Sequence, residues 1–140
     1  MPKRFSPFLL LASRLPINSQ IMKVLIIEQE KTFQQSLSYY LEHHGNSEVL
    51  LAHSKKEGIS LQETSACDVV FCGDRLPDGD GLDTLKEMIQ KNPQIISVLM
   101  TVRGDESLKQ EALKAGIRGY LEKPFDLKQL EEVMDANRKQ

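Results

Sequence analysis

The chain has 140 residues, a size that suits one domain with a buried core of its own. Hydrophobic residues make up 40% of the sequence and charged residues 27%, which is typical of globular proteins. The net charge of -2, without any long run of Lys or Arg, argues against a surface built to bind nucleic acid or a membrane. No stretch has the roughly 18 to 20 consecutive apolar residues that a membrane-spanning helix needs.

The first 21 residues differ in pattern from the rest of the chain. Lys3 and Arg4 precede a short apolar run at 8–12, as in a secretory signal, but the run is too short, and Arg14 and Pro16 come soon after it. We therefore expect an N-terminal extension outside the core at 1–21, followed by one domain at 22–140. A short docking or anchoring helix is the alternative interpretation of the extension.

From Met22 onward, strand and helix patterns alternate five times. Residues 23–27 form an unbroken apolar run rich in β-branched side chains, which is typical of a strand buried on both faces. Helical spacing comes next, and Gly45 with Asn46 is expected to end that helix. The apolar face of this helix consists of Phe33, Leu37, Tyr40 and Leu41.

A second strand is predicted at 49–52 and a third at 68–72, separated by a helix. Ser54 and Glu57 have the spacing of a capping box at the start of that helix. Cys67 and Cys72 lie close to the third strand. We expect them to be core thiols of a protein in the reducing cytoplasm, with a disulfide or a metal-binding pair as the alternative.

The second half of the chain continues the same alternation. A third helix presents Leu82, Leu85, Met88 and Ile89 on one face. A fourth strand at 95–100 precedes a fourth helix that begins near Asp105 and ends at Gly116. A fifth strand at 119–122 is followed by a last helix, which Asp126 caps and which presents Leu127, Leu130, Val133 and Met134 on one face.

Five strand–helix units predict a doubly wound, flavodoxin-like α/β fold, (βα)5, with a parallel sheet of strand order 2-1-3-4-5. In such sheets, ligands bind beyond the carboxyl ends of the strands, where the strand order reverses. Four segments lie directly after those ends, namely 28–30, 73–75, 100–102 and 123–124. We expect them to converge on one crevice.

These segments resemble those of a known family. The stretches KVLIIEQE, DVVFCGDRLPDGDGL, VLMT and AGIRGYLEKPF, in this order and spacing, resemble the receiver domain of two-component response regulators, as in the chemotaxis regulator. The resemblance covers residues 22–140. It implies a domain that accepts a phosphoryl group on an aspartate ending the third strand, beside a Mg²⁺ ion that two acidic residues hold. A hydroxyl and a lysine then bind the phosphoryl oxygens.

The residues at the matching positions depart from that pattern. Gly73 stands at the phosphoacceptor position, four residues before Pro77, and the acidic pair becomes Glu28 and Gln29. The remaining positions carry Thr101 as the hydroxyl, Val102 as the residue after it, Lys123 as the lysine, and Tyr120 as the aromatic switch of the output face. Val102 is larger than the small residue usual there and would crowd a phosphoryl group.

The charge at these positions predicts an inactive site. Glu28 and Lys123 cancel, and Gln29 and Gly73 contribute no charge, so little remains to attract a hard divalent cation. We therefore expect no cofactor, no metal, no catalytic residue and no enzymatic activity. The predicted function is a cytoplasmic, phosphorylation-independent signalling module.

The resemblance also implies the kind of partner. The expected partner is a protein, whether a sensor kinase, an output domain or another signalling protein, and neither nucleic acid nor a membrane. The expected contact surface comprises the fourth helix, the fifth strand and the fifth helix, with Arg118, Tyr120 and Lys128 as candidate residues.

An alternative keeps the phosphorylation. A bulge at Gly73 would turn Asp74 toward the crevice as an acceptor, with Mg²⁺ held by Glu28, Asp74 and the backbone carbonyl of Arg75. Neighbouring side chains of a strand normally point to opposite faces. We therefore favour a rim position for Asp74, paired with Arg75 or Lys123.

Other polar residues favour structural roles. Asp78 and Asp80 could serve as acids in a third interpretation, a small enzyme such as a phosphatase, but no nucleophile is paired with a base. The sequence at 78–81 also lacks the ligand spacing of a calcium loop, so a turn is predicted. His43 and His44 suit a helix end, and His53 is expected to be exposed.

Overall fold

The computed structural model describes residues 22–44 and 47–138, and for 134–138 it describes the backbone alone. In this part of the chain the strands of the main sheet are β1 (Met22–Ile27), β2 (Ser47–Ala52), β3 (Val69–Gly73), β6 (Ile96–Thr101) and β7 (Gly119–Glu122). The helices are α2 (Lys31–His44), α3 (Lys55–Ser65), α4 (Gly81–Lys91), α5 (Glu106–Lys114) and α6 (Leu127–Arg138). The strands pair in parallel in the order β2-β1-β3-β6-β7, which confirms the predicted doubly wound topology.

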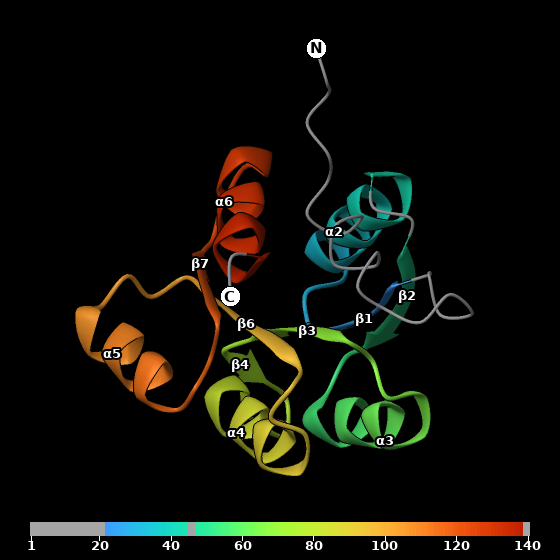
Figure 1. Ribbon diagram of the computed structural model, residues 1–140, viewed down its shortest axis with the longest axis horizontal. Helices are drawn as coiled ribbons and strands as arrows, with labels where there is room; N and C mark the ends of the chain where they lie inside the picture. The colour runs from blue at the N-terminus through green and yellow to red at the C-terminus, as the bar shows by residue number, and fades with distance from the viewer. Residues whose placement is uncertain (1–21, 45–46, 139–140) are drawn as a thin grey trace.

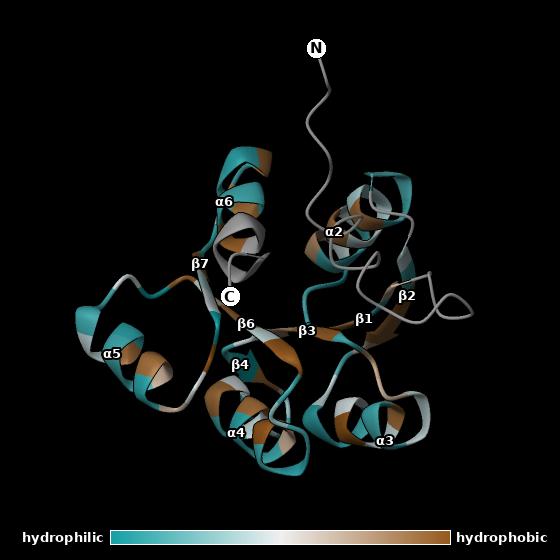
Figure 2. Cartoon of the chain, viewed as in Figure 1, coloured by the Kyte–Doolittle hydropathy of each residue, from teal (hydrophilic) through white to brown (hydrophobic). Residues whose placement is uncertain are grey.

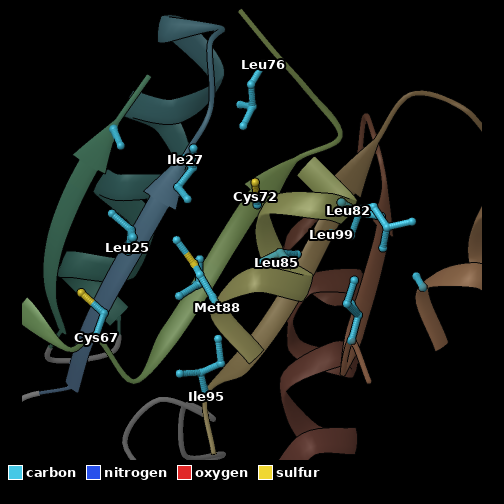
Figure 3. Close-up of a cluster of buried hydrophobic side chains, with 14 of the residues drawn as sticks. Leu25, Ile27, Cys67, Cys72, Leu76, Leu82, Leu85, Met88, Ile95 and Leu99 are labelled. Atoms are coloured by element: carbon cyan, nitrogen blue, oxygen red, sulfur yellow. The ribbon is translucent and has the colours of Figure 1, made fainter. Parts of the chain in front are cut away.

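Helices cover both faces of the sheet, with α2 and α6 on one side and α3 and α4 on the other (Figure 1). Successive side chains of each strand point to alternate faces, so the central strands are apolar along their length, as the colouring of β1 and β3 shows (Figure 2). Val24, Ile26 and Phe71 belong to the core under α2 and α6. Leu25 and Cys72 belong to the core that α3, α4 and α5 cover (Figure 3).

The predicted helix caps at Ser54 and Asp126 are confirmed, and Asp105, near which the fourth helix was expected to begin, is also an N-cap. The hydroxyl of Ser54 accepts from the amide of Glu57 at 3.1 Å, and Asp105 and Asp126 each accept from an amide three residues ahead. Gly116, after α5, has a φ of 91°, a conformation that favours glycine. The predicted cap at Gly45–Asn46 and the side chain of Met134 lie outside what the structure describes.

Cys67 and Cys72 are buried free thiols, as predicted, and form no disulfide. Burial raises the pKa of Cys67 to about 11 and that of Cys72 further still. Both therefore stay protonated at neutral pH and pack as small apolar side chains. Among the described residues, no helix is long and apolar enough to cross a membrane.

The segment between β3 and α4 contains a short hairpin that the sequence did not predict. Its strands, β4 (Arg75–Leu76) and β5 (Gly79–Asp80), are antiparallel. Asp80 is the N-cap of α4 and accepts from the amide of Leu82 at 2.7 Å. Asp78 caps a different helix, because its two carboxylate oxygens accept from the amides of Lys55 and Lys56 in α3, at 2.7 and 3.0 Å. Both acids thus have structural roles.

Replacing Asp78 with alanine should lower the melting temperature at neutral pH, because two amide donors at the start of α3 lose their acceptor. The hydrogen bonds from Lys56 and Lys55 hold the pKa of Asp78 below its ordinary value. A lowered pKa in the folded state stabilises the protein above the ordinary carboxyl pKa, and that contribution disappears as the pH falls through the lowered value. The difference in melting temperature should therefore shrink in acid.

Thermal unfolding of both proteins, followed by circular dichroism from neutral to strongly acidic pH, measures this difference. Asp83→Ala is the matched control, since Asp83 is an exposed acid in the first turn of α4. The first amides of α3 donate to Asp78 and not to Asp83. A pH-independent difference for Asp78→Ala would show that the capping depends on side-chain volume and not on charge.

Candidate functional site

The segments at the carboxyl ends of the strands do converge, and they form two side-chain clusters. One cluster joins the ends of β1 and β7 through Glu28 and Lys123. The other joins the ends of β3 and β6 through Asp74 and Thr101. Gly73, the last residue of β3, lies between them in the sheet.

The first cluster is a buried ion pair. Nζ of Lys123 donates to Oε1 of Glu28 at 2.7 Å, and the two side chains are only 13% and 3% exposed. The second carboxylate oxygen of Glu28 accepts from the amide of Glu30 at 3.0 Å. The ammonium of Lys123 also lies 4.6 Å from the ring centroid of Phe33. Both oxygens of Glu28 are therefore engaged within the protein.

The carboxylate of Glu28 also fills the space beside Gly73. A Cβ atom built on Gly73 would lie 2.6 Å from Oε1 of Glu28, closer than real Cβ contacts. On its other side the backbone of Gly73 lies against Gly81, where a Cβ would overlap the carbonyl oxygen of Gly73. The position at the end of β3 is therefore packed without any side chain of its own.

The second cluster centres on Asp74. The hydroxyl of Thr101 donates to Oδ2 of Asp74 at 2.7 Å, and Nε of Arg103 lies 3.4 Å from the same oxygen. The side chain of Asp74 is 9% exposed, while that of Arg103 is 43% exposed. The prediction that Asp74 lies at the rim and pairs with Arg75 or Lys123 was therefore wrong.

The strand register explains the partner of Asp74. β3 and β6 pair regularly from Val69 with Ile96 to Gly73 with Met100, so no bulge interrupts β3. One residue farther along, Asp74 comes beside Thr101. Residues paired across two parallel strands point to the same face of the sheet, so these two side chains meet. Position 73 belongs to the face with Phe71 in the core, and position 74 to the face with Cys72.

The remaining predicted positions are more exposed. Gln29 and Arg75 are exposed, and Val102 is 69% exposed, so its side chain does not crowd the interior. Tyr120 is partly buried, which raises the pKa of its phenol, and its hydroxyl donates to the backbone carbonyl of Arg103 at 3.2 Å. Arg103 was not singled out from the sequence. Only the register of β3 with β6 makes it a neighbour of Asp74.

A groove of about 520 Å³ lies along β7 between α5 and α6, on the predicted contact surface. Its lining comprises residues of β7, of both helices and of the loops beside them: Gly104, Asp105, Glu106, Lys109, Leu113, Arg118, Gly119, Tyr120, Leu121, Glu122, Gln129, Glu132 and Val133. Two of the three candidate contact residues, Arg118 and Tyr120, therefore line the groove, and Lys128 is exposed nearby on α6.

The two clusters contain the carboxylates of Glu28 and Asp74, and each of them already has a partner within the protein. Glu28 is neutralised by Lys123, Gln29 offers a neutral amide, and Gly73 offers no side chain. Magnesium is bound in proteins by carboxylates and waters in a near-octahedral arrangement. Among the described residues, no group of three or more His, Cys, Asp or Glu side chains could hold a metal ion.

The chain is similar to proteins of known family. The sequence profile of the "Response regulator receiver domain" family matches residues 24–135, which is more than half of the chain. The chain is 32% identical over 112 residues to the transcriptional regulatory protein ZraR of Salmonella typhimurium, covering 80% of this chain and 25% of that protein. It is 34% identical over 108 residues to the KDP operon transcriptional regulatory protein KdpE of Escherichia coli, covering 77% of this chain and 47% of that protein.

A solved structure agrees with these sequence matches. The crystal structure of a response regulator receiver domain protein from Clostridium thermocellum superimposes with a TM-score of 0.76 at 32% identity, covering 85% of this chain and 97% of that one. The chain thus spans a quarter to a half of the regulators that it matches and nearly all of an isolated receiver domain. Receiver domains are signalling modules, not enzymes, and they interact with kinases and output domains. The profile, the relatives and the fold together show that this chain belongs to the response regulator receiver domain family.

Proposed function

We propose that this receiver domain is a protein-interaction module that works without phosphorylation. The observation that supports this most directly is at position 73. Gly73 has no carboxylate to accept a phosphoryl group, and the carboxylate of Glu28 fills the space that a side chain there would need. The acceptor is thus absent, and the flexible carboxylate of Glu28 occupies its place.

The electrostatics of the site support the same proposal. Transfer of a phosphoryl group to a carboxylate brings anions together, so the repulsion has to be offset by a metal ion and by cationic side chains. Here the ammonium of Lys123 is already bound to Glu28, and the carboxylates that would hold Mg²⁺ are missing at positions 29 and 73. The residues present do not fit a magnesium ion.

The proposed contact surface is the groove along β7 with the flanking faces of α5 and α6. Its proposed partner is a sensor kinase, an output domain or another signalling protein in the cytoplasm. Leu113 and Leu127, which are 54% and 53% exposed, lie on these two helices and offer apolar area to such a partner. We also propose that the domain comprises residues 22–140 and that 1–21 lie outside its core.

A second candidate is phosphorylation of Asp74, the next residue along the chain. One observation favours it: the carboxylate of Asp74 lies 2.7 Å from the hydroxyl of Thr101, which corresponds to the phosphoryl-binding hydroxyl of the family. The regular pairing of β3 argues against it. That pairing places Asp74 on the face opposite position 73, while Lys123 is engaged with Glu28.

Acetyl phosphate with Mg²⁺ separates the two candidates. We expect no mass increase of one phosphoryl group after incubation of the full chain with both reagents, because no carboxylate lies at position 73. Intact-protein mass spectrometry makes the measurement, and a receiver domain with a complete site serves as the positive control for the reagent.

Asp74→Asn decides the meaning of any adduct. An adduct that forms on the unmodified chain and is lost in Asp74→Asn would replace the proposal with the second candidate. An adduct retained in that variant and mapped to another residue of the site would contradict both.

A further inference from the structure

A continuous chain of hydrogen bonds connects the end of β3 with the groove along β7. Thr101 donates its hydroxyl proton to Asp74 at 2.7 Å, and the amide of Arg103 donates to the same hydroxyl oxygen at 2.9 Å. The carbonyl of Arg103 then accepts from the hydroxyl of Tyr120 at 3.2 Å. Each contact shares a residue with the next, so the carboxylate and the aromatic side chain are linked without a gap.

The first contact sets the direction of the second. A threonine hydroxyl has one proton to donate and lone pairs to accept with. Because the carboxylate of Asp74 only accepts, the hydroxyl of Thr101 donates its hydrogen bond to Asp74 and directs a lone pair at the amide of Arg103. Thr101 is fully buried and Asp74 nearly so, and a hydrogen bond to a charged acceptor is stronger in such surroundings than in water.

The far end of the chain of contacts is a wall of the groove. Gly104 and Tyr120 both line the groove. Gly104 follows Arg103 in the chain, and the hydroxyl of Tyr120 donates to the carbonyl of Arg103. The loop that these contacts fix, residues 101–104, is otherwise exposed from Val102 onward. The backbone of Thr101 is also held beside β7, because its carbonyl accepts from the amide of Lys123 at 2.7 Å, whereas the backbone of Arg103 is hydrogen-bonded to the hydroxyls of Thr101 and Tyr120.

We propose that Asp74 is a positioning residue that takes the place of a bound phosphoryl group, holding Thr101 and, through Arg103, the loop and Tyr120 at the wall of the groove. The inference rests on the proposed function, because a permanent substitute is needed only where no phosphoryl group arrives. It gives the interaction surface one fixed shape. The ion pair with Arg103 adds little, since that side chain is exposed to solvent that screens its charge.

Amide hydrogen exchange of the full chain, measured by NMR, tests this proposal. Asp74→Ala removes the charge-assisted hydrogen bond that orients the hydroxyl of Thr101. The amide of Arg103, which donates to that hydroxyl, should then exchange about tenfold faster. The ring resonances of Tyr120 should also shift or broaden. Thr101→Val, which removes the hydroxyl and keeps the shape, should give the same two changes while leaving Asp74 in place.

Asp83→Ala is the matched control, because it removes an exposed acid in α4 outside these contacts and should change neither signal. If Asp74→Ala does not fold, Asp74→Asn and Thr101→Val decide. Unchanged exchange at Arg103 and an unchanged Tyr120 ring in the folded variants would overturn the inference.

The readouts need neither a partner nor a phosphoryl donor, so this result is independent of the test of function. A phosphoryl adduct with acetyl phosphate would contradict the proposed function and leave the contacts of Asp74 measurable. Slow exchange at Arg103 in Thr101→Val, without an adduct, would contradict the inference and leave the proposed function standing.

Discussion

Replacing Lys123 with methionine is expected to lower the free energy of unfolding by about 3 kcal/mol, because it leaves a buried carboxylate without its counter-charge. Glu28 is 3% exposed, and Lys123 is the cation that neutralises it, at 2.7 Å. Methionine keeps the length of the side chain and a favourable contact with the ring of Phe33, so the loss comes mainly from the charge. For a domain of this size, the melting temperature should fall by about 10 °C.

The double variant Glu28→Gln/Lys123→Met tests the origin of that loss. Glutamine can still accept from the amide of Glu30, and because it is neutral, it needs no counter-charge when buried. Removing both charges of a buried pair is far less costly than removing one. The double variant should therefore regain about 2 kcal/mol relative to Lys123→Met, measured as the difference between their free energies of unfolding in urea.

Lys128→Met is the matched control, since Lys128 is an exposed lysine on α6, and its effect should stay within about 0.5 kcal/mol. If Lys123→Met changed the free energy of unfolding as little as Lys128→Met does, the ion pair would not form in solution. The charge argument for a closed site would then lose its basis.

The sequence predicted the topology and the mutual neutralisation of Glu28 and Lys123, for local reasons. Each strand and helix carries its own periodicity, and parallel order results once the units alternate. Glu28 and Lys123 come after strands that end at the same edge of the sheet, so their mutual neutralisation was expected and the ion pair shows it.

The features that the sequence did not predict depend on contacts between distant segments. The partner of Asp74 is determined by the register of β3 with β6, and no local pattern gives that register. The role of Asp78 depends on α3, whose first amides lie 22 and 23 residues earlier in the chain. Asp80 differs, because an aspartate directly before an apolar helical stripe is a local N-cap pattern that could have been recognised.

The hairpin of β4 and β5 was missed for another reason. Each of its strands has two residues, too short for any alternation of apolar and polar side chains to appear. Its effect on the site is large all the same, because it brings Gly81 against the carbonyl oxygen of Gly73. A side chain at position 81 would push the end of β3 out of place.

Restoring carboxylates at two positions should create magnesium binding. In Gly73→Asp/Gln29→Asp the site would carry three carboxylates against one ammonium, in place of the neutral pair of Glu28 and Lys123. Two unlike charges at 4 Å attract by about 4 kcal/mol at an effective dielectric constant of 20, so affinity for Mg²⁺ should rise about a hundredfold or more over the unmodified chain. Isothermal titration calorimetry measures the affinity.

The single variant Gly73→Asp should not suffice. Its Cβ would lie 2.6 Å from Oε1 of Glu28, so that flexible carboxylate has to move, and only one new carboxylate is gained. We expect Mg²⁺ binding to appear only when Gln29 is also replaced.

Gly73→Asn/Gln29→Asn is the matched control, because it introduces nearly the same atoms at the same two positions without their charge. It should bind no more Mg²⁺ than the unmodified chain. Equal binding by the aspartate and asparagine variants, or micromolar binding by the unmodified chain, would contradict the argument that missing charge keeps the metal away. Binding confined to the aspartate pair would instead mean that two substitutions separate this site from one able to hold the ion, and that the fold around it needs no further change.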